Sequence, residues 1–268
     1  MQGSGNGQKI GLAALVCALG VTLVDLRLVL IPVMLFLFMC MVAPFLYRFS
    51  FFLSIISRGC TGQRVVALTF DDGPDPATTP HLLRLLSARD VPATFFVVGQ
   101  RAAAYPELIR AILDAGHTIG NHSFRHDSLV AFRGPEKIAA EILMAQRVLE
   151  DLGVTPMVFR PPVGITYPGL AKVLERLGLV AVTFSCRAWD RGNRSIGRLA
   201  ERILGRARPD DIIMLHDHPP VHRGNLSHWL AEVEAILSGI PSKGLVFRPL
   251  SELIGRPVDR RPGQATRI

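Results

Sequence analysis

Charged residues and cysteines are both scarce in this chain of 268 residues. Only 19% of the residues are charged, whereas 49% are hydrophobic. A disordered chain needs low hydrophobicity and high net charge, so this composition excludes one. Four cysteines in a chain of this length exclude a small fold held together by disulfides. The chain has no internal repeat and no low-complexity segment, and its length predicts one or two domains.

Two long apolar runs lie near the N-terminus. Residues 10–24 and residues 28–47 contain no charged side chain. About 20 apolar residues are enough to cross a bilayer. We therefore expect residues 1–60 to form a membrane anchor, either one transmembrane segment or a hairpin of two, at about 10–24 and 28–47. A cleaved signal peptide is the alternative, but the combined apolar region is too long and only Lys9 precedes it.

Basic residues are concentrated at the two ends of the chain. Residues 1–60 contain four basic residues and one acidic residue, and residues 248–268 contain five and two. The segment between them is close to neutral. A nucleic-acid-binding domain needs a basic face on its folded part, so we expect no nucleic-acid partner. Basic ends suit anionic lipid headgroups, and we expect the protein at the cell (inner) membrane, with residues 256–268 as a basic tail.

The side of the membrane that the main domain faces stays open. If both apolar runs span the bilayer, the two ends of the hairpin face the same side. Arg48, Arg58 and Arg64 then favour a cytoplasmic domain under the positive-inside rule. If only the second run spans, with Lys9 inside, the domain lies outside.

Short β-rich runs alternate with amphipathic helical patterns after residue 60. The expected strands are 65–70, 93–98, 118–121, 158–159, 180–184, 212–215 and 245–247. The expected helices are 79–89, 106–115, 135–152, 168–177, 195–206 and 226–237, with Ser195 as an N-cap. This alternation predicts a parallel sheet covered by helices. No GxGxxG follows the first strand, so we predict an α/β fold, a distorted (β/α)7-type barrel over residues 61–255.

Polar side chains follow several of the predicted strands at the point where each ends. They are Asp71, Asp72, His122, Arg160 and His216. The carboxyl ends of the strands of a parallel barrel open on one face, so we expect these residues to converge. His122 and His126 have HxxxH spacing, and Asp72 adds a carboxylate from another strand end. Two histidines and one aspartate can hold a divalent metal and leave positions open for water and substrate.

The remaining polar residues of this face can move protons. Asp71 and Asp72 point different ways on an extended chain, so Asp71 is free to act as a general base while Asp72 binds metal. Arg160 lies in a stiff segment before two prolines and is a suitable partner to orient Asp71. His216 follows an apolar strand and is suited to protonate a leaving amine.

Four segments in this order resemble the signature of a known family. They are TFDDGP at 69–74, HSFRH at 122–126, RPPVG at 160–164 and LHD at 215–217. They resemble those of the NodB-type polysaccharide deacetylases, carbohydrate esterase family 4, over roughly residues 62–250. The resemblance implies a distorted barrel that removes an acetyl or formyl group from an amino sugar of a glycan or a lipid-linked saccharide.

The resemblance also implies a role for each residue. Asp71 would be the catalytic base, His216 the acid, and Arg160 the residue that orients Asp71. The metal ligands would be Asp72, His122 and His126. The metal in this family is usually zinc and sometimes cobalt, nickel or manganese. The residues around the acyl group would be Pro161, Val163, Trp189 and Leu215.

The chain departs from the family pattern in two segments. Val163 stands where the family usually has an aromatic residue, and Ala188 stands where an aspartate usually precedes the tryptophan. That aspartate tunes the acid, so we hypothesise that Asp190 holds His216 instead. If nothing holds it, the alternative is a non-catalytic barrel that binds metal and sugar. A third hypothesis is an oxygenase with the same ligand set, which would need iron and a co-substrate.

Overall fold

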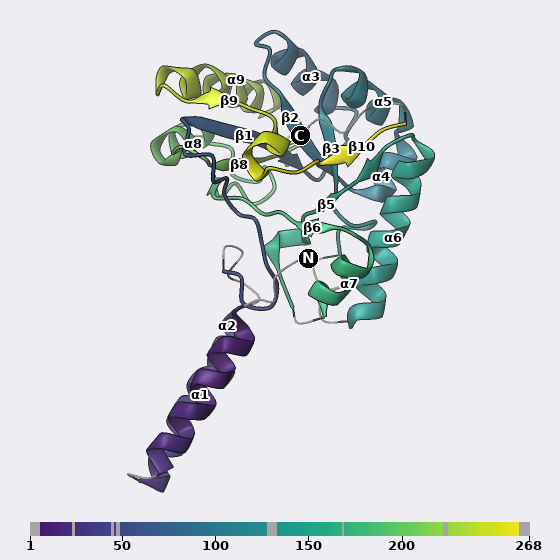
Figure 1. Cartoon of the computed structure of the whole chain (residues 1–268). Coiled ribbons are helices and arrows are strands. Elements are labelled where there is room, and N and C mark those ends of the chain that lie inside the picture. The colour runs from purple at the N-terminus through teal and green to yellow at the C-terminus, as the bar shows by residue number, and fades with distance from the viewer. Residues whose placement is uncertain are drawn as a thin grey trace.

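The structure is a computed structural model that describes residues 6–22, 25–43, 46, 49–127, 133–167, 169–221 and 225–262. An α/β domain forms most of it, and two N-terminal helices project from this domain (Figure 1). The helices are α1 (Gly7–Thr22) and α2 (Leu30–Val42), joined through the short helix η1 (Leu26–Val29).

The main sheet is parallel throughout. Its strands are β1 (Val65–Asp71), β2 (Ala93–Val97), β3 (Thr118–Asn121), β5 (Val158–Phe159), β6 (Val180–Ala181), β7 (Cys186–Arg187), β8 (Ile212–His216) and β9 (Val246–Phe247). Seven of them follow the order β6-β5-β3-β2-β1-β8-β7, and β9 pairs with the start of β1. Within the described residues β6 and β7 do not pair with each other, so the sheet is a curled half-barrel. The predicted α/β class is confirmed.

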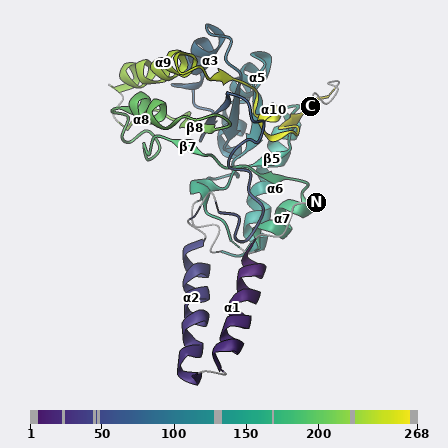
Figure 2. The ribbon, with the colours of Figure 1, turned by 60° about the vertical axis from the view of Figure 1, so that its left-hand side comes forward.

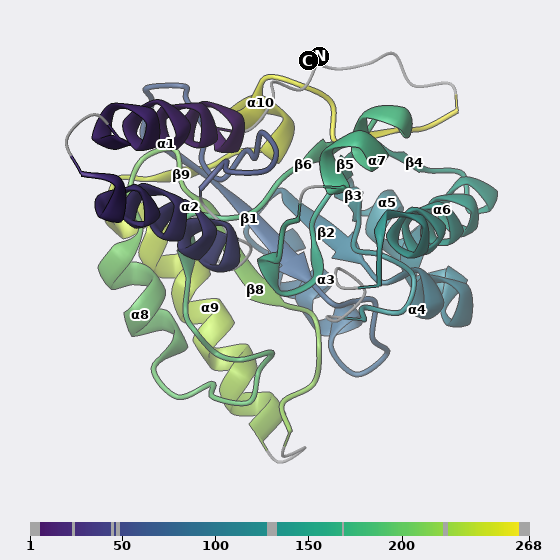
Figure 3. The same cartoon turned by 90° about the horizontal axis from the view of Figure 1, so that it is seen from below.

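Helices surround the strands, as the view from below shows (Figure 3). They are α3 (Thr79–Ser87), α4 (Gly99–Ala104), α5 (Pro106–Asp114), α6 (Pro135–Asp151), α7 (Leu170–Arg176), α8 (Leu199–Arg206), α9 (Leu226–Ser242) and α10 (Leu250–Ile254). Helix α3 begins with a proline in its first turn and buries Leu82 and Leu86, four residues apart on one face. Helix α5 shows the same pattern and buries Leu108, Ile109 and Ile112 on one side.

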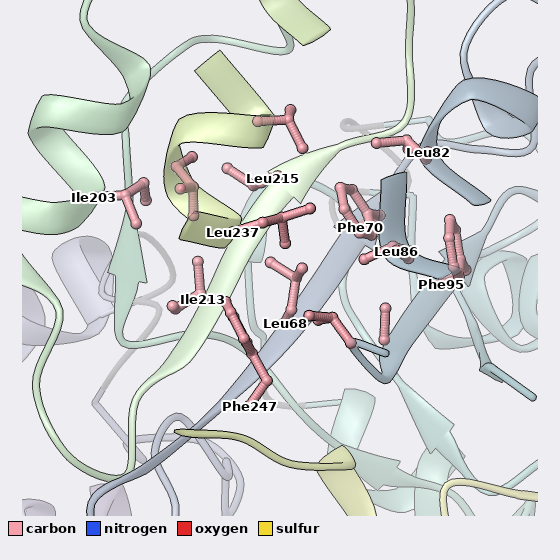
Figure 4. Packing of buried hydrophobic residues seen from close by; sticks show 14 of the residues in the cluster. Leu68, Phe70, Leu82, Leu86, Phe95, Ile203, Ile213, Leu215, Leu237 and Phe247 are labelled. Carbon is pink, nitrogen blue, oxygen red and sulfur yellow. The ribbon is translucent and has the colours of Figure 1, made fainter. Parts of the chain in front are cut away.

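The core lies on both faces of β1. All seven of its residues are buried. Leu68 and Phe70 pack with Leu82 and Leu86 of α3 in the largest cluster (Figure 4), where the Phe70 and Phe95 rings stack with centroids 5.1 Å apart. Alternate residues of β1 point to the opposite face, where they join a second cluster. Because β1 is apolar on both sides, it forms the centre of the sheet.

Helices α1 and α2 lie side by side and extend away from the domain (Figure 2). Their apolar side chains are largely exposed, for example Leu15 at 56% and Phe38 at 56%. The helices contain 16 and 13 residues. Within the described residues, no helix is both long enough and apolar enough to cross a membrane. The predicted transmembrane spans are therefore unsupported, although residues 23–24, 44–45 and 47 of the predicted runs lie outside the described residues.

The segment just before β1 belongs to the domain. Leu53 is fully buried among residues of α6 and α7. Phe51 is also buried, but it contacts the N-terminal helices, since its carbonyl accepts a hydrogen bond from the N–H of Gly7 and its ring centroid lies 6.4 Å from that of Phe36. Ile56 forms a parallel bridge with Val182, and Arg58 bridges Asp211. The structured domain therefore begins before residue 61, the boundary that the sequence predicts.

The C-terminal segment also belongs to the domain. Strand β10 (Asp259–Arg260) pairs with β4 (Thr155–Pro156) in a small antiparallel sheet. Asp259 accepts a hydrogen bond from the backbone N–H of Ile119, and Arg261 donates to the carbonyls of Leu113 and His117. The predicted basic tail over 256–268 is thus part of the fold as far as Arg261, and residues 263–268 lie outside the described residues.

Candidate active site

The end of β1 is the centre of the candidate site. Asp71 is its last residue and Asp72 follows it with φ at 73°, a left-handed conformation that turns the chain sharply. The parallel register between β1 and β8 places Asp71 directly beside His216. The backbone N–H of Asp217 donates to the carbonyl of Asp71 at 2.7 Å and fixes this alignment.

Asp72, His122 and His126 form a cluster that could hold a metal ion. Their ligand atoms all lie within 4.8 Å of one another. Nε2 of His126 is 3.1 Å from Oδ1 of Asp72, and Nε2 of His122 is 3.5 Å from the same atom. His122 directly follows β3, which ends at Asn121, whereas His126 comes from the following loop with φ at 56°. The structure therefore brings together the three ligands that the sequence predicts.

The surroundings of the cluster fit a divalent metal. Nδ1 of His122 lies 2.7 Å from the carbonyl oxygen of Arg160, so this nitrogen donates and Nε2 is left for the metal. Oδ1 of Asp72 is buried and has no hydrogen-bond partner among the described residues. A buried carboxylate oxygen without a hydrogen-bond partner destabilises the folded protein unless it binds a cation or a water molecule.

The charge state of the cluster also suits metal binding. Burial raises the pKa of Asp72, but its interactions with His122 and His126 outweigh burial and hold the pKa well below its ordinary value. Burial, reinforced by the neighbouring His122, lowers the pKa of His126. A carboxylate that stays ionised and an imidazole that stays neutral are the forms that bind metals.

Arg160 holds Asp71 from behind. Its guanidinium is fully buried and donates to Oδ1 of Asp71 at 2.5 Å and to the hydroxyl of Thr69 at 2.8 Å. It also donates to the carbonyl of Thr183 and stacks over the Phe96 ring at 3.8 Å. These contacts surround the guanidinium, so Arg160 binds Asp71 from behind and does not line the pocket.

His216 and Asp190 form a second charged pair at the site. Nδ1 of His216 lies 2.7 Å from Oδ2 of Asp190. Burial lowers the pKa of His216, but the hydrogen bond and charge of Asp190, with the charges of Asp72 and Asp71, raise it to about 9. The contact that the sequence hypothesis requires of Asp190 is present.

A pocket of about 1040 Å³ opens over these groups. Pro161, Val163 and Trp189 line it, as the sequence predicts. Leu215 does not: it is 1% exposed and packs in the largest core cluster (Figure 4). Side chains alternate along a strand, so the neighbours Met214 and His216 point to the pocket and Leu215 points away.

Several residues that shape the site lie outside the sequence prediction. Asp217 is buried and accepts hydrogen bonds from the hydroxyls of Thr78 and Thr79, both at 2.6 Å. A Cβ at Gly73 would overlap the Asp217 carboxylate, so only glycine fits there. The side chain of Asn193 donates to the carbonyls of His216 and His218. The signature segments cover Gly73 and Asp217, but no sequence signal marks Asn193.

The fold and the site together define an α/β half-barrel with an Asp/His/His cluster that could hold a metal ion, and the comparisons with known proteins agree. The family model for polysaccharide deacetylases matches residues 58–182. A peptidoglycan-N-acetylglucosamine deacetylase of Bacillus cereus is 33% identical, over 72% of this chain and 89% of that protein. A chitooligosaccharide deacetylase of Bradyrhizobium is 37% identical, over 72% and 92%.

Solved structures are similar as well. The crystal structure of the Bc1960 peptidoglycan N-acetylglucosamine deacetylase matches with a TM-score of 0.70 and 28% identity, covering 77% of this chain and 95% of that one. A family 4 carbohydrate esterase from Streptomyces lividans, in complex with acetate, matches with a TM-score of 0.61 and 34% identity, covering 70% and 92%. The chain belongs to the polysaccharide deacetylase family, carbohydrate esterase family 4.

Proposed function

We propose that this protein is a metal-dependent hydrolase that removes the N-acetyl group from N-acetylglucosamine units of a saccharide. The observation that carries the proposal is the position of Asp71. Its Oδ1 is bound to Arg160, and its Oδ2 faces the metal cluster, 4.0 Å from Nε2 of His122. The relatives named for peptidoglycan and chitooligosaccharide deacetylation support the choice of acetyl group and sugar.

Asp72, His122 and His126 would hold the metal, zinc being the expected ion, and the bound ion would polarise the acyl carbonyl and acidify water. Asp71 accepts a proton from the attacking water at its free oxygen, Oδ2. Arg160 fixes the other oxygen and stabilises the ionised carboxylate.

His216 supplies the second proton. It stands beside Asp71 across the register of β1 and β8, at the same pocket. As water adds to the acyl carbon and the C–N bond breaks, His216 donates its proton to the departing nitrogen. Asp190 holds the ring through Nδ1, which leaves Nε2 to face the substrate. The products are a free amino sugar and acetate.

The test is acetate and formate release by the full chain in detergent, with N-acetylated and N-formylated glucosamine oligomers as the two substrates. We expect acetate release that chelation abolishes, that Zn²⁺ or Co²⁺ restores, and that Asp71→Asn abolishes. Release of formate alone, from N-formylated oligomers, would overturn the choice of acyl group. Bound metal and bound saccharide without release would instead establish the non-catalytic alternative, which the contact between Asp190 and His216 disfavours.

We further propose that α1 and α2 attach the protein to a lipid membrane, on the cell (inner) membrane of its host. The proposal rests on apolar side chains exposed around both helices, including Leu15, Leu19, Leu35 and Phe38. Exposed apolar surface of this extent is unusual in a water-soluble monomer. A membrane-attached domain would meet lipid-linked or nascent saccharides at close range.

Flotation with vesicles of phosphatidylethanolamine and phosphatidylglycerol tests this attachment. We expect the full chain to float with vesicles and Leu19→Asp/Phe38→Asp to stay at the bottom. Gln63→Asp/Ala104→Asp, which adds the same charge at exposed positions of the domain, should float like the wild type. Equal flotation of all three proteins would contradict the proposed role of the two helices.

A further inference from the structure

The wall of the pocket is rich in arginine. Five arginines line it and, among the described residues, no lysine does. They are Arg101, Arg125, Arg187, Arg191 and Arg194. The pocket also has three acidic residues, but each already has a partner: Asp71 binds Arg160, Asp190 binds His216, and Asp72 belongs to the metal cluster. The wall therefore has a surplus of positive charge.

The composition of the domain does not account for this surplus. Residues 61–247 contain 21 basic and 19 acidic side chains, so the domain as a whole is nearly neutral. The excess basic charge of the chain lies at its two ends instead. Five arginines around one pocket are thus a local concentration, and a concave site lined by one sign of charge attracts ligands of the other sign.

Four of the arginines fall into two groups with different surroundings, and the fifth, Arg187, stacks over the Trp189 ring with its guanidinium carbon 3.5 Å from the ring centroid. On one side Arg101 pairs with Asp75 at 3.2 Å and Arg125 pairs with Glu141 at 2.8 Å, so their charges are partly balanced. On the other side Arg191 and Arg194 are exposed and form no ion pair within the described residues. Arg191 and Arg194 are therefore the cations that remain available to a ligand.

The loop that carries them is well fixed. Asn193 is buried between the two arginines, and its side chain ties the loop to the carbonyl of His216 at 3.1 Å. The backbone N–H of Ser195 donates to the carbonyl of Asp190 at 2.9 Å. Arg191 and Asn193 both have positive φ, at 54° and 58°. Such backbone is uncommon outside glycine and persists where surrounding contacts enforce it.

We propose that the substrate of this site is an anionic saccharide, and that Arg191 and Arg194 bind its phosphate or carboxylate group. The inference rests on the proposed deacetylation, because it names the class of sugar that enters the same pocket. The planar guanidinium matches both phosphate and carboxylate with two parallel hydrogen bonds. The anion sits on the side of the pocket formed by the loop after β7, beside Asp190 and away from the paired arginines.

Three probes that share the same non-reducing N-acetylglucosamine unit and differ in their reducing end test the proposal: N,N′-diacetylchitobiose, its 1-phosphate, and its aldonic acid. We expect kcat/KM of the full-length enzyme to be about tenfold higher for the anionic probe that matches the natural anion than for the neutral one. Arg191→Gln and Arg194→Gln should each reduce this ratio about fivefold. High salt should reduce it as well.

Arg198→Gln is the matched control. Arg198 is exposed on the same segment, has φ at 62°, and pairs with Glu201, but it does not line the pocket. Its substitution removes the same charge and should leave the ratio unchanged. A ratio that falls equally in Arg198→Gln would mean that overall charge is responsible, and it would overturn the assignment of the two arginines.

Binding to Asp71→Asn, measured by titration calorimetry, separates this proposal from the proposed function. Tighter binding of either anionic probe than of the neutral one supports the anionic substrate, whether or not acetate is released by the wild type. A preference for the 1-phosphate identifies phosphate, and one for the aldonic acid identifies carboxylate. Equal binding of all three probes overturns the inference, even if acetate release stands.

Discussion

Nδ1 of His216 lies 2.7 Å from Oδ2 of Asp190, which comes directly after Trp189 in the chain. The usual family partner would come directly before that tryptophan, where this chain has Ala188. Trp189 has φ at 60°, and the turn it makes brings Asp190 back toward the end of β8. A carboxylate thus reaches His216, the proposed acid, from the residue after the tryptophan instead of the residue before it.

Asp190→Asn should shift the alkaline limb of the pH–activity profile to lower pH. His216 must be protonated to donate, so activity falls as pH rises through its pKa of about 9. Loss of the Asp190 charge lowers this pKa, so the limb should move to lower pH and kcat should fall about tenfold or more. The pH profile of kcat/KM measures the change. Asp151→Asn, an exposed control on α6, should keep the wild-type profile, and an unchanged Asp190→Asn profile would exclude the tuning role.

Asp71 and Arg160 should depend on each other for stability. Arg160→Met leaves a buried carboxylate without its partner, at a cost of about 3–5 kcal/mol in the free energy of unfolding. Asp71→Asn should lower activity about 10²- to 10⁴-fold while metal content stays the same. The double variant Asp71→Asn/Arg160→Met should be more stable than Arg160→Met alone, because no unpaired charge remains. Urea unfolding of the four proteins gives the coupling, and additive effects would mean that the 2.5 Å contact contributes little.

Metal removal should lower thermal stability as well as activity. A ligand at 100 times its Kd stabilises the folded state by about 2.7 kcal/mol. In a domain of this size that corresponds to a rise in Tm of about 5–10 °C. We expect Zn²⁺ to raise the Tm of the chelated protein and not that of His126→Ala. His228→Ala, on the exposed side of α9, should respond like the wild type, and a shift that survives in His126→Ala would place the ion elsewhere.

Leu53→Ala tests whether the segment before β1 is part of the domain. Leu53 is fully buried, so its truncation should lower the free energy of unfolding by about 2–5 kcal/mol. Leu12→Ala, at a position that is 64% exposed on α1, should change it little. Chemical unfolding in detergent measures both. Equal effects would argue that residues 49–58 belong to the anchor, as the sequence predicts.

The sequence predicts the regular parts of the fold well. The strand expected at 118–121 is β3, and the helix expected at 135–152 ends one residue earlier, at Asp151. The helix has apolar residues at helical spacing between Pro135 and Gly153, which mark its ends. The strand expected at 180–184 stops at Ala181 because the next carbonyls, of Val182 and Thr183, accept hydrogen bonds from Arg160. Such a contact comes from a distant residue, and no local pattern reveals it.

Two other predictions differ from the structure for different reasons. The helix expected from Ser195 begins at Leu199, since Ser195 bonds back to Asp190 and Arg198 adopts a left-handed conformation. The apolar composition of residues 49–56 is typical both of a segment at a membrane interface and of a segment in a protein core. Composition alone does not distinguish these two locations.

The candidate site is predictable where residues come in motifs. The metal ligands and Asp71 lie within two short segments at strand ends, so the parallel topology alone brings them together. The arginines of the pocket wall come from three separate segments without a spacing pattern. Leu215 is misplaced by the prediction because the motif identifies the segment but not the face of the strand.

Strand β1 ends in Asp71 and pairs with β2, β8 and β9, and every residue in it is buried. Amide hydrogens in such a strand exchange with solvent only when the whole domain opens. His126, in contrast, lies in the loop after β3, outside the sheet. Partial opening of that loop would therefore release a proposed metal ligand while the proposed base stays in position. Reversible loss of activity on mild heating should then precede unfolding, and recovery on cooling should not require refolding of the strand that holds the base.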